Sequence, residues 1–151
     1  MKALKTNTLY TYLLFLLFCN AVSAANYTWT GTTNTSWNNS GNWSPAGIPS
    51  TNDNVTIGST TNKPVLTANT TIKKLTMTGD TLNLNGDTLT VSDDAALSGG
   101  NIKNGHLKIT AGNAVYSGTS FNVTINAVCN FNKFNGSTFN NNCVFETTSK
   151  Q

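Results

Sequence analysis

The chain has 151 residues, the usual length of one domain once a targeting segment is allowed for, and its formal charge is +3. It contains 24 Asn and 26 Thr, short polar residues that favour turns and strands over helix interiors, so the composition excludes a helical bundle. Arg is absent, and Glu, Gln and His occur once each, so most side chains that enzymes use for acid, base and anion chemistry are missing. We therefore expect a protein that is not an enzyme.

The positive charge is not gathered into a binding surface. Two of the nine Lys, Lys2 and Lys5, lie in the first five residues, which leaves seven Lys against six acidic residues. Only Lys73 and Lys74 are adjacent, whereas binding to nucleic-acid phosphates needs clustered basic side chains. We expect no nucleic-acid partner.

Residues 1–24 have the three parts of a secretory signal peptide. Lys2 and Lys5 form the charged start, an apolar run of ten residues spans Leu9–Phe18, and small residues precede an expected cleavage site after Ala24. The run is about half the ~20 residues that a membrane helix needs, so no membrane span is expected in the mature chain. These features predict a secreted protein, extracellular or on the outer cell surface.

The cysteines allow two interpretations. Cys19 follows Phe18, whereas the residue before a lipoprotein cysteine is normally small, so a lipid anchor is the less favoured alternative. Cys129 and Cys143 remain in the mature chain, and a disulfide between them would close a loop of about 15 residues and stabilise the fold by about 3 kcal/mol. The alternative is a pair of small buried apolar side chains. Two Cys and the distant His106 are too few for a metal site, so we expect neither a metal nor another cofactor.

Residues 25–54 and residues 55–151 differ in composition. The first segment holds all three tryptophans, Trp29, Trp37 and Trp43, together with two of the three prolines. The second segment carries short apolar groups with alternating polar positions, which is typical of strands. We expect residues 25–54 to form a Trp-rich N-terminal cap and residues 55–151 to form the repetitive part of the fold.

The apolar groups recur at the spacing of one solenoid turn. Leu82 and Ile102 lie twenty positions apart, as do Leu89 and Ile109, and a repeat of that length can form one turn of a β-solenoid. The step of five from Ile102 to Leu107 would place the two on opposite faces of a continuous strand, so a corner must lie between them. The pattern predicts a parallel β-helix with these residues pointing inward: Leu82, Leu84, Leu89, Val91, Leu97, Ile102, Leu107 and Ile109.

A second fold stays open at this point. Asn85-Gly86 lies between two alternating apolar groups, and Asn-Gly in that setting is a strong signal for a two-residue hairpin. Hairpins repeated along the chain would build an antiparallel β-sandwich.

The chain also resembles the opening segment of many large bacterial surface proteins. The matching residues are Tyr27–Gly31, Ser36–Asn38, Gly41–Ser44, Asp53–Ile57, Pro64–Ile72 and Leu82–Val91. It looks like the start of an adhesin-like or autotransporter-like β-helix of the Bacteroidota type over about residues 27–104. The resemblance implies a right-handed parallel β-helix and carries no shared catalytic motif.

We therefore expect an exported, non-enzymatic surface module, adhesive or structural, that is part of a larger β-helix protein. Its partners would be surface glycans or other cell-surface proteins, and an open edge would allow self-association. The alternative is a carbohydrate-binding module in which exposed Trp29, Trp37 and Trp43 stack on sugar rings.

The last stretch of the sequence predicts an uncovered end. Apolar residues continue through Val144 and Phe145, and polar residues follow from Glu146 without a covering helix or an aromatic lid. Solenoids need a cap at both ends, so we expect the last rung to expose Phe139, Val144 and Phe145. The same pattern predicts that the chain is truncated at its C-terminal side.

Overall fold

The structure, a computed structural model, describes residues 23–148, so nearly all of the expected signal peptide lies outside the described residues. Within that part, no helix is long and apolar enough to cross a membrane. The elements are β1 (Asn26–Trp29), η1 (a 3₁₀ turn, Ser40–Asn42), β2 (Trp43–Ser44), β3 (Asn54–Ile57), β4 (Thr70–Ile72), β5 (Lys74–Met77), β6 (Thr81–Asn83), β7 (Thr88–Val91), β8 (Ala95–Ser98), β9 (Asn101–Ile109), β10 (Asn113–Ser117), β11 (Ser120–Cys129), β12 (Phe131–Asn135), β13 (Thr138–Phe139) and β14 (Cys143–Thr147).

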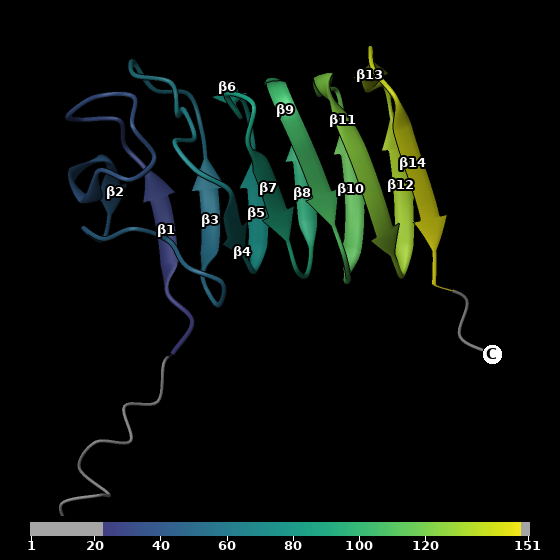
Figure 1. Cartoon of the computed structure of the whole chain (residues 1–151), viewed down its shortest axis with the longest axis horizontal. Coiled ribbons are helices and arrows are strands. Elements are labelled where there is room, and N and C mark those ends of the chain that lie inside the picture. Colours follow the sequence, from purple (N-terminus) through teal and green to yellow (C-terminus); the bar gives the residue numbers. More distant parts are fainter. Residues whose placement is uncertain (1–22, 149–151) are drawn as a thin grey trace, which may run out of the picture.

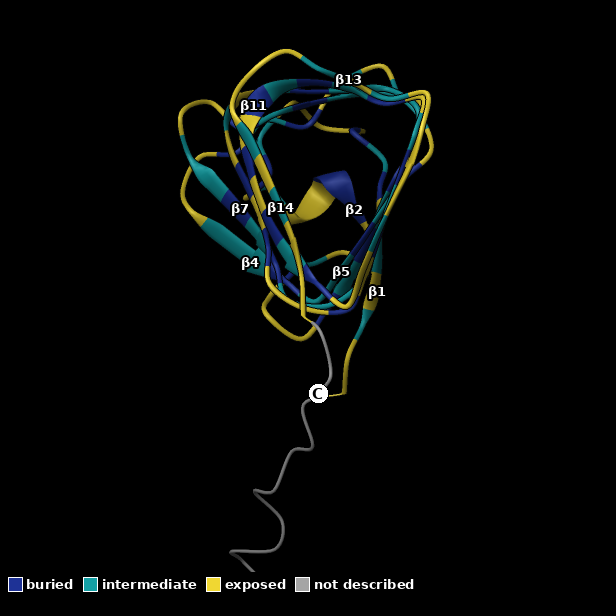
Figure 2. Ribbon diagram, turned by 90° about the vertical axis from the view of Figure 1, so that its right-hand side faces the viewer, coloured by how far each residue is buried: buried dark blue, intermediate teal, exposed yellow. Residues whose placement is uncertain are grey.

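The strands wind into a β-solenoid of about five turns, which confirms the predicted fold class. One sheet has the order β12-β10-β8-β5-β3-β1-β2, and the other has the order β13-β11-β9-β7-β4. The long strands β9 and β11 bend across a corner, so each pairs with two short strands: β9 with β6 and β7, and β11 with β13 and β14. Figures 1 and 2 show the resulting right-handed coil and its three-sided outline.

Neighbouring turns are held in a fixed register. On the side that contains β3, β5, β8, β10 and β12, the inward residues pair in the order Val55, Leu75, Ala95, Ala114 and Asn132. The differences between these numbers show that the first two turns on this side each advance the chain by twenty positions, the third by nineteen and the fourth by eighteen. The predicted spacing of twenty holds for Leu82 and Ile102, which are partners.

One of the two predicted repeats of twenty positions is wrong. Leu89 pairs with Leu107, and Val91 pairs with Ile109, so this part of the turn advances the chain by only eighteen positions. The difference arises at a corner, because the earlier turn makes a wider excursion through Asn85 (φ 53°) and Gly86 (φ 89°).

The Asn-Gly corner also decides against the antiparallel sandwich. The strands on either side of it, β6 and β7, both run parallel to β9 and do not form a hairpin with each other. Asn85 and Gly86 supply two left-handed residues that turn the chain through a corner, and each flanking strand finds its partner in the next turn. Among the described residues, the only antiparallel strand pair is β1 with β2.

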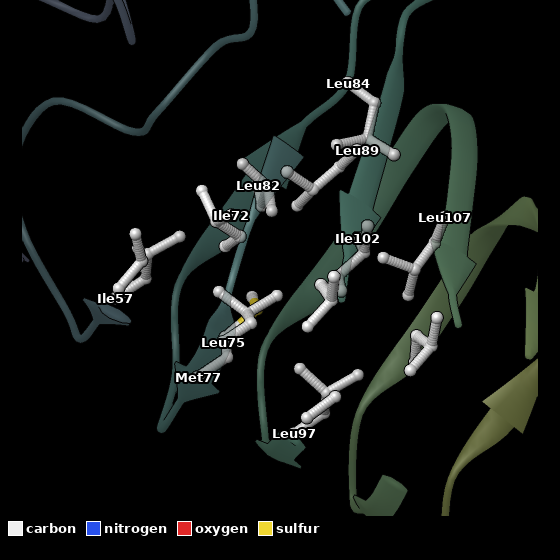
Figure 3. Packing of buried hydrophobic residues seen from close by; sticks show 14 of the residues in the cluster. Ile57, Ile72, Leu75, Met77, Leu82, Leu84, Leu89, Leu97, Ile102 and Leu107 are labelled. Carbon is white, nitrogen blue, oxygen red and sulfur yellow. The ribbon is translucent and has the colours of Figure 1, made fainter. Parts of the chain in front are cut away.

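Each side of each turn contributes one or more apolar side chains to the interior of the coil. All eight residues predicted to point inward are buried, with at most 1% of each exposed. Figure 3 labels six of them, Leu82, Leu84, Leu89, Leu97, Ile102 and Leu107, and shows them stacked along the axis with counterparts from earlier turns, among them Ile57 and Met77. Because each side chain packs mainly on its neighbours in the adjacent turns, the stability of a turn depends on the turns beside it.

Replacing Leu89 by Asp tests this packing. Leu89 is fully buried on β7, which lies between β4 and β9. The substitution places an unpaired carboxylate in the core and should lower the unfolding free energy by about 4 kcal/mol. Thr90→Asp is the matched control, since Thr90 points outward and is paired with Lys108. Urea denaturation followed by circular dichroism measures both. A loss for Leu89→Asp no larger than for Thr90→Asp would contradict the inward packing.

Candidate functional site

The three tryptophans form a lid at the N-terminal end of the coil. The ring of Trp43 lies edge-on between Trp29 and Trp37, with centroid distances of 4.9 and 4.7 Å. In the view along the axis, β2 lies within the outline of the coil (Figure 2). This placement agrees with the predicted Trp-rich cap. All three indoles are at least 97% buried, so the alternative of exposed Trp rings that stack on sugars is wrong for this fold.

A buried amide that sequence reasoning missed organises the lid. Asn42 is fully buried, and its Oδ1 accepts hydrogen bonds from the backbone N–H groups of Thr33 (2.9 Å) and Asn34 (3.0 Å). Its Nδ2 donates to Asn34 Oδ1 and to the Ser36 carbonyl, both at 2.8 Å. One side chain thus fixes the loop that carries Trp37, one of the three rings of the lid. In the sequence, Asn42 is one of 24 Asn and has no distinguishing feature.

We expect Asn42→Ala to loosen the lid. The substitution leaves buried N–H and C=O groups without partners, which should lower the unfolding free energy by about 2 to 3 kcal/mol. Asn38→Ala is the control, because Asn38 is exposed and makes one side-chain hydrogen bond, to Thr67. Tryptophan fluorescence reports on the lid directly: emission should shift towards that of exposed indole in Asn42→Ala and stay unchanged in Asn38→Ala. Equal effects of the two substitutions would contradict this role.

A buried carboxylate lies just before β3, next to the start of β1. Asp53 is 6% exposed, and its Oδ1 accepts a hydrogen bond from the N–H of Ala25 at 2.8 Å. Its Oδ2 accepts from the backbone N and the hydroxyl of Ser50, at 2.8 and 2.7 Å. Burial alone raises the pKa of this carboxyl, but the hydrogen bonds from Ser50 and Ala25 outweigh it, so the pKa lies below its usual value. Among residues 23–148, Asp53 has no salt-bridge partner.

The opposite end of the coil is formed by β12, β13 and β14, which we call the terminal rung. Each strand sends one phenyl ring inward: Phe134, Phe139 and Phe145. The three rings meet edge to face, with centroid distances of 4.8 to 5.7 Å. They close the bore with an aromatic disc. The sequence places Phe139 and Phe145 in the last rung, but it does not show that their rings meet that of Phe134.

The disc continues the packing of the turn beneath it. Phe134 stacks on Tyr116 and Phe139 stacks on Phe121, with interplanar angles of 8° and 6°. Asn132 joins two sides of the rung, since its Oδ1 accepts from the Tyr116 hydroxyl (3.2 Å) and its Nδ2 donates to the Glu146 carbonyl (3.1 Å). The terminal rung is therefore ordered by contacts to the turn below it.

The other face of the terminal rung is uncovered within residues 23–148. Phe134 is 49% exposed, and the strands of the rung pair only with the preceding turn. Phe139 and Phe145 are partly buried and pack against the core. Val144 is 49% exposed as predicted, but for a different reason, because it points outward beside Asn126 while Cys143 and Phe145 point inward.

The disulfide considered between Cys129 and Cys143 is not formed, and both thiols are free. Cys143 pairs with Ile125 and Cys129 pairs with Thr147 across the same two strands. The two cysteines are thus offset by four strand positions, about 13 Å, whereas a disulfide needs Cα atoms within about 7 Å. Burial raises the pKa of each thiol. Burial also raises the pKa of Tyr116, with smaller contributions from Cys129 and Cys143.

The state of the cysteines gives a direct test. The chain from Ala25 onward should contain two free thiols without added reductant, and maleimide should modify Cys143 before the fully buried Cys129. Both should react quickly once the protein is unfolded in urea. Mass spectrometry counts the added groups. A non-reduced mass lower by two hydrogens, with no labelling in urea, would contradict the free thiols.

The remaining titratable candidates lie apart from both ends. His106 is exposed on the outer face of β9, between Thr88 and Thr124, and Asp87 lies at the preceding corner. Among residues 23–148, no group of three or more His, Cys, Asp or Glu could hold a metal ion. The acidic residues instead join neighbouring turns, as in the pairs Lys63–Asp80 (2.7 Å) and Lys74–Asp94 (2.6 Å).

Comparison with known proteins identifies a family but no characterised relative. A family model described as "Domain of unknown function (DUF8693)" matches residues 28–127, about two thirds of the chain, and the chain belongs to this family. No curated protein and no solved structure matches it. The matched residues begin within β1 and end in β11, so they include the Trp lid and most of the coil.

Proposed function

We propose that this family member is an exported, non-enzymatic module of the cell surface, adhesive or structural in role, and that it forms part of a larger β-helix. The solenoid supports a structural role, because its polar side chains bridge adjacent turns. Asn140 donates to Asn122 at 2.8 Å and Asn122 donates to Asn101 at 3.3 Å, which links three turns on one face. Such ladders stiffen a stack of parallel strands.

The outer faces suit weak polar contact with another surface. Thr28, Thr56 and Thr76 are register partners in consecutive turns and all point outward. They are followed by Ala96 and Val115, so this column is lined by short uncharged side chains as far as β10, and it ends at Lys133 on β12. In an adhesive role, these outer faces would contact glycans or surface proteins, and the buried tryptophans would take no part in the contact.

The observation that carries the export proposal is the contact between Ala25 and Asp53. Asp53 is a nearly buried carboxylate that is held by neutral hydrogen-bond donors and has no cationic partner among the described residues, and an adjacent positive charge would stabilise it further. Cleavage after Ala24 would convert the Ala25 nitrogen into an ammonium group 2.8 Å from Asp53 Oδ1. Signal-peptide removal would thus supply the missing positive charge at the place where the fold already holds the nitrogen.

Fractionation of a secreting bacterial host that expresses the full chain tests the proposal. We expect the protein outside the cytoplasm, accessible to added protease on intact cells, with Ala25 as its first residue. Leu14→Arg, which interrupts the apolar run of the signal, is the control that should keep the chain inside. A chain that stays cytoplasmic, or one that begins well away from Ala25, would contradict the proposal.

The ion pair predicts a specific pH dependence. In the exported chain, Asp53→Asn should lower the unfolding free energy by about 2 kcal/mol at pH 6. An α-amino group loses its proton near pH 8, so the pair stabilises the fold below that pH, and the difference between wild type and variant should shrink towards pH 10. Asp94→Asn is the matched control, because its partner Lys74 stays charged over this range and has a pKa raised chiefly by Asp94. Urea titrations at each pH measure both differences.

A further inference from the structure

The terminal rung gathers most of the exposed apolar surface. Four large hydrophobic side chains are exposed in the described part, and three of them, Phe131, Phe134 and Val144, belong to this rung. The strands β12 and β14 lie at the C-terminal end of the coil (Figure 1), and the aromatic disc lies between them. Unpaired strand edges beside an apolar surface are a template for pairing with another chain.

The two ends of the coil differ, which restricts how copies can join. The N-terminal end is covered by the Trp lid, and the edge of β1 is occupied by the antiparallel strand β2. A terminal rung therefore cannot continue its parallel register on the lid of a second copy. Two copies can still meet through the same end, which gives a closed twofold dimer instead of a growing fibre.

A twofold axis through β13 matches the shape of the rung to itself. The axis places β13 against the partner's β13 and places β12 against the partner's β14, with both pairs antiparallel. The chain advances along the coil axis as it winds. Relative to β13, β12 at the start of the rung is therefore set back towards the coil, and β14 at the end of the rung stands forward by about the same amount. The axis places β12 of one copy, which is set back, against β14 of the other, which stands forward. The end surfaces of the two copies are therefore complementary in shape.

The register of this pairing also matches charge. Opposed residues of an antiparallel pair point to the same side, so Phe134 must face an inward residue of the partner's β14. Setting it opposite the partner's Phe145 joins the two aromatic discs and places Lys133 opposite the partner's Glu146. Both are outward and exposed, and neither has a salt-bridge partner within residues 23–148. Symmetry forms this pair twice.

We propose that the partner of the terminal rung is a second copy of this chain, joined end to end through β12, β13 and β14 with Lys133 paired to the partner's Glu146. The inference rests on the proposed structural role, and it gives the larger β-helix a physical form: two coils with one continuous core and a lid at each outer end. It makes no use of export, so self-association and secretion are measured independently.

Charge reversal tests the interface with the purified chain from Ala25 to Gln151, made without the segment before it. Sedimentation equilibrium over a range of concentrations should show a monomer–dimer equilibrium for the wild type and no larger species. Lys133→Glu and Glu146→Lys should each weaken dimerisation at least tenfold, because each places like charges opposite one another at two sites. The double variant Lys133→Glu/Glu146→Lys should restore it, and an equimolar mixture of the two single variants should form a heterodimer.

The controls separate the interface from folding and from general charge effects. Lys108→Glu reverses a charge on the outer face of β9, away from the rung, and should leave dimerisation unchanged. Circular dichroism must show each variant folded. A wild type that stays monomeric at its highest soluble concentration, a dimer insensitive to both single reversals, or assembly beyond the dimer would each overturn the proposal. If the wild type stays monomeric, further turns of a longer chain would be the alternative cover for the terminal rung.

Discussion

The register between one turn of the coil and the next is the constraint on which the rest of this protein depends. Each turn has apolar side chains on the inside and backbone hydrogen-bonding groups along both edges, and neither can be satisfied within the turn itself. Val55, Leu75 and Ala95 stack because their strands pair in parallel, and the strands pair because those residues stack. Both ends of such a stack therefore need special chemistry, and the two ends of this chain use aromatic residues in opposite ways.

The N-terminal end is closed by indoles held by polar contacts. Trp43 Nε1 donates to the Trp37 carbonyl at 2.8 Å, and Trp29 Nε1 donates to the Asn62 carbonyl at 2.8 Å, so two of the rings are fixed by their polar atoms as well as by packing. The C-terminal disc consists of phenyl rings, which offer no such polar atom. A surface of this kind is stabilised by whatever apolar group covers it, so the two ends differ: the lid is fixed by its own polar contacts, and the disc is not.

The fold was predictable from sequence because the length of a solenoid turn sets the spacing of the apolar residues along the chain. Leu82 and Ile102 carry the turn length, and the steps of five carry the corners, so the coil and its inward residues follow from counting. Counting fails where a corner changes length, as at Asn85-Gly86, because a wider excursion alters the spacing without altering the strands.

The candidate sites were less predictable because they arise from contacts between distant residues. The tryptophans were visible as a group, yet their composition alone left open whether they were buried or exposed. Asn42 and Asp53 differ from many similar residues only in what surrounds them, and the aromatic disc assembles from three strands. The cysteines show the same limit, since two cysteines in a chain expected to be secreted suggested a bond that a four-position offset along the strands prevents.

The gradual change from turn to turn has a consequence for how the chain finds its structure. A coil of identical repeats could slide by one whole turn and still pair every strand, a trap that repetitive sequences must avoid. Here the later turns are shorter than the earlier ones, and the residues stacked along one line change from Ile57 and Met77 to Tyr116 and Phe134. A chain shifted by one turn would meet corners of the wrong length and rings where aliphatic groups belong. The irregularity of the repeat thus makes each turn pair best with its correct neighbours, so the differences between the turns specify the register of the whole coil.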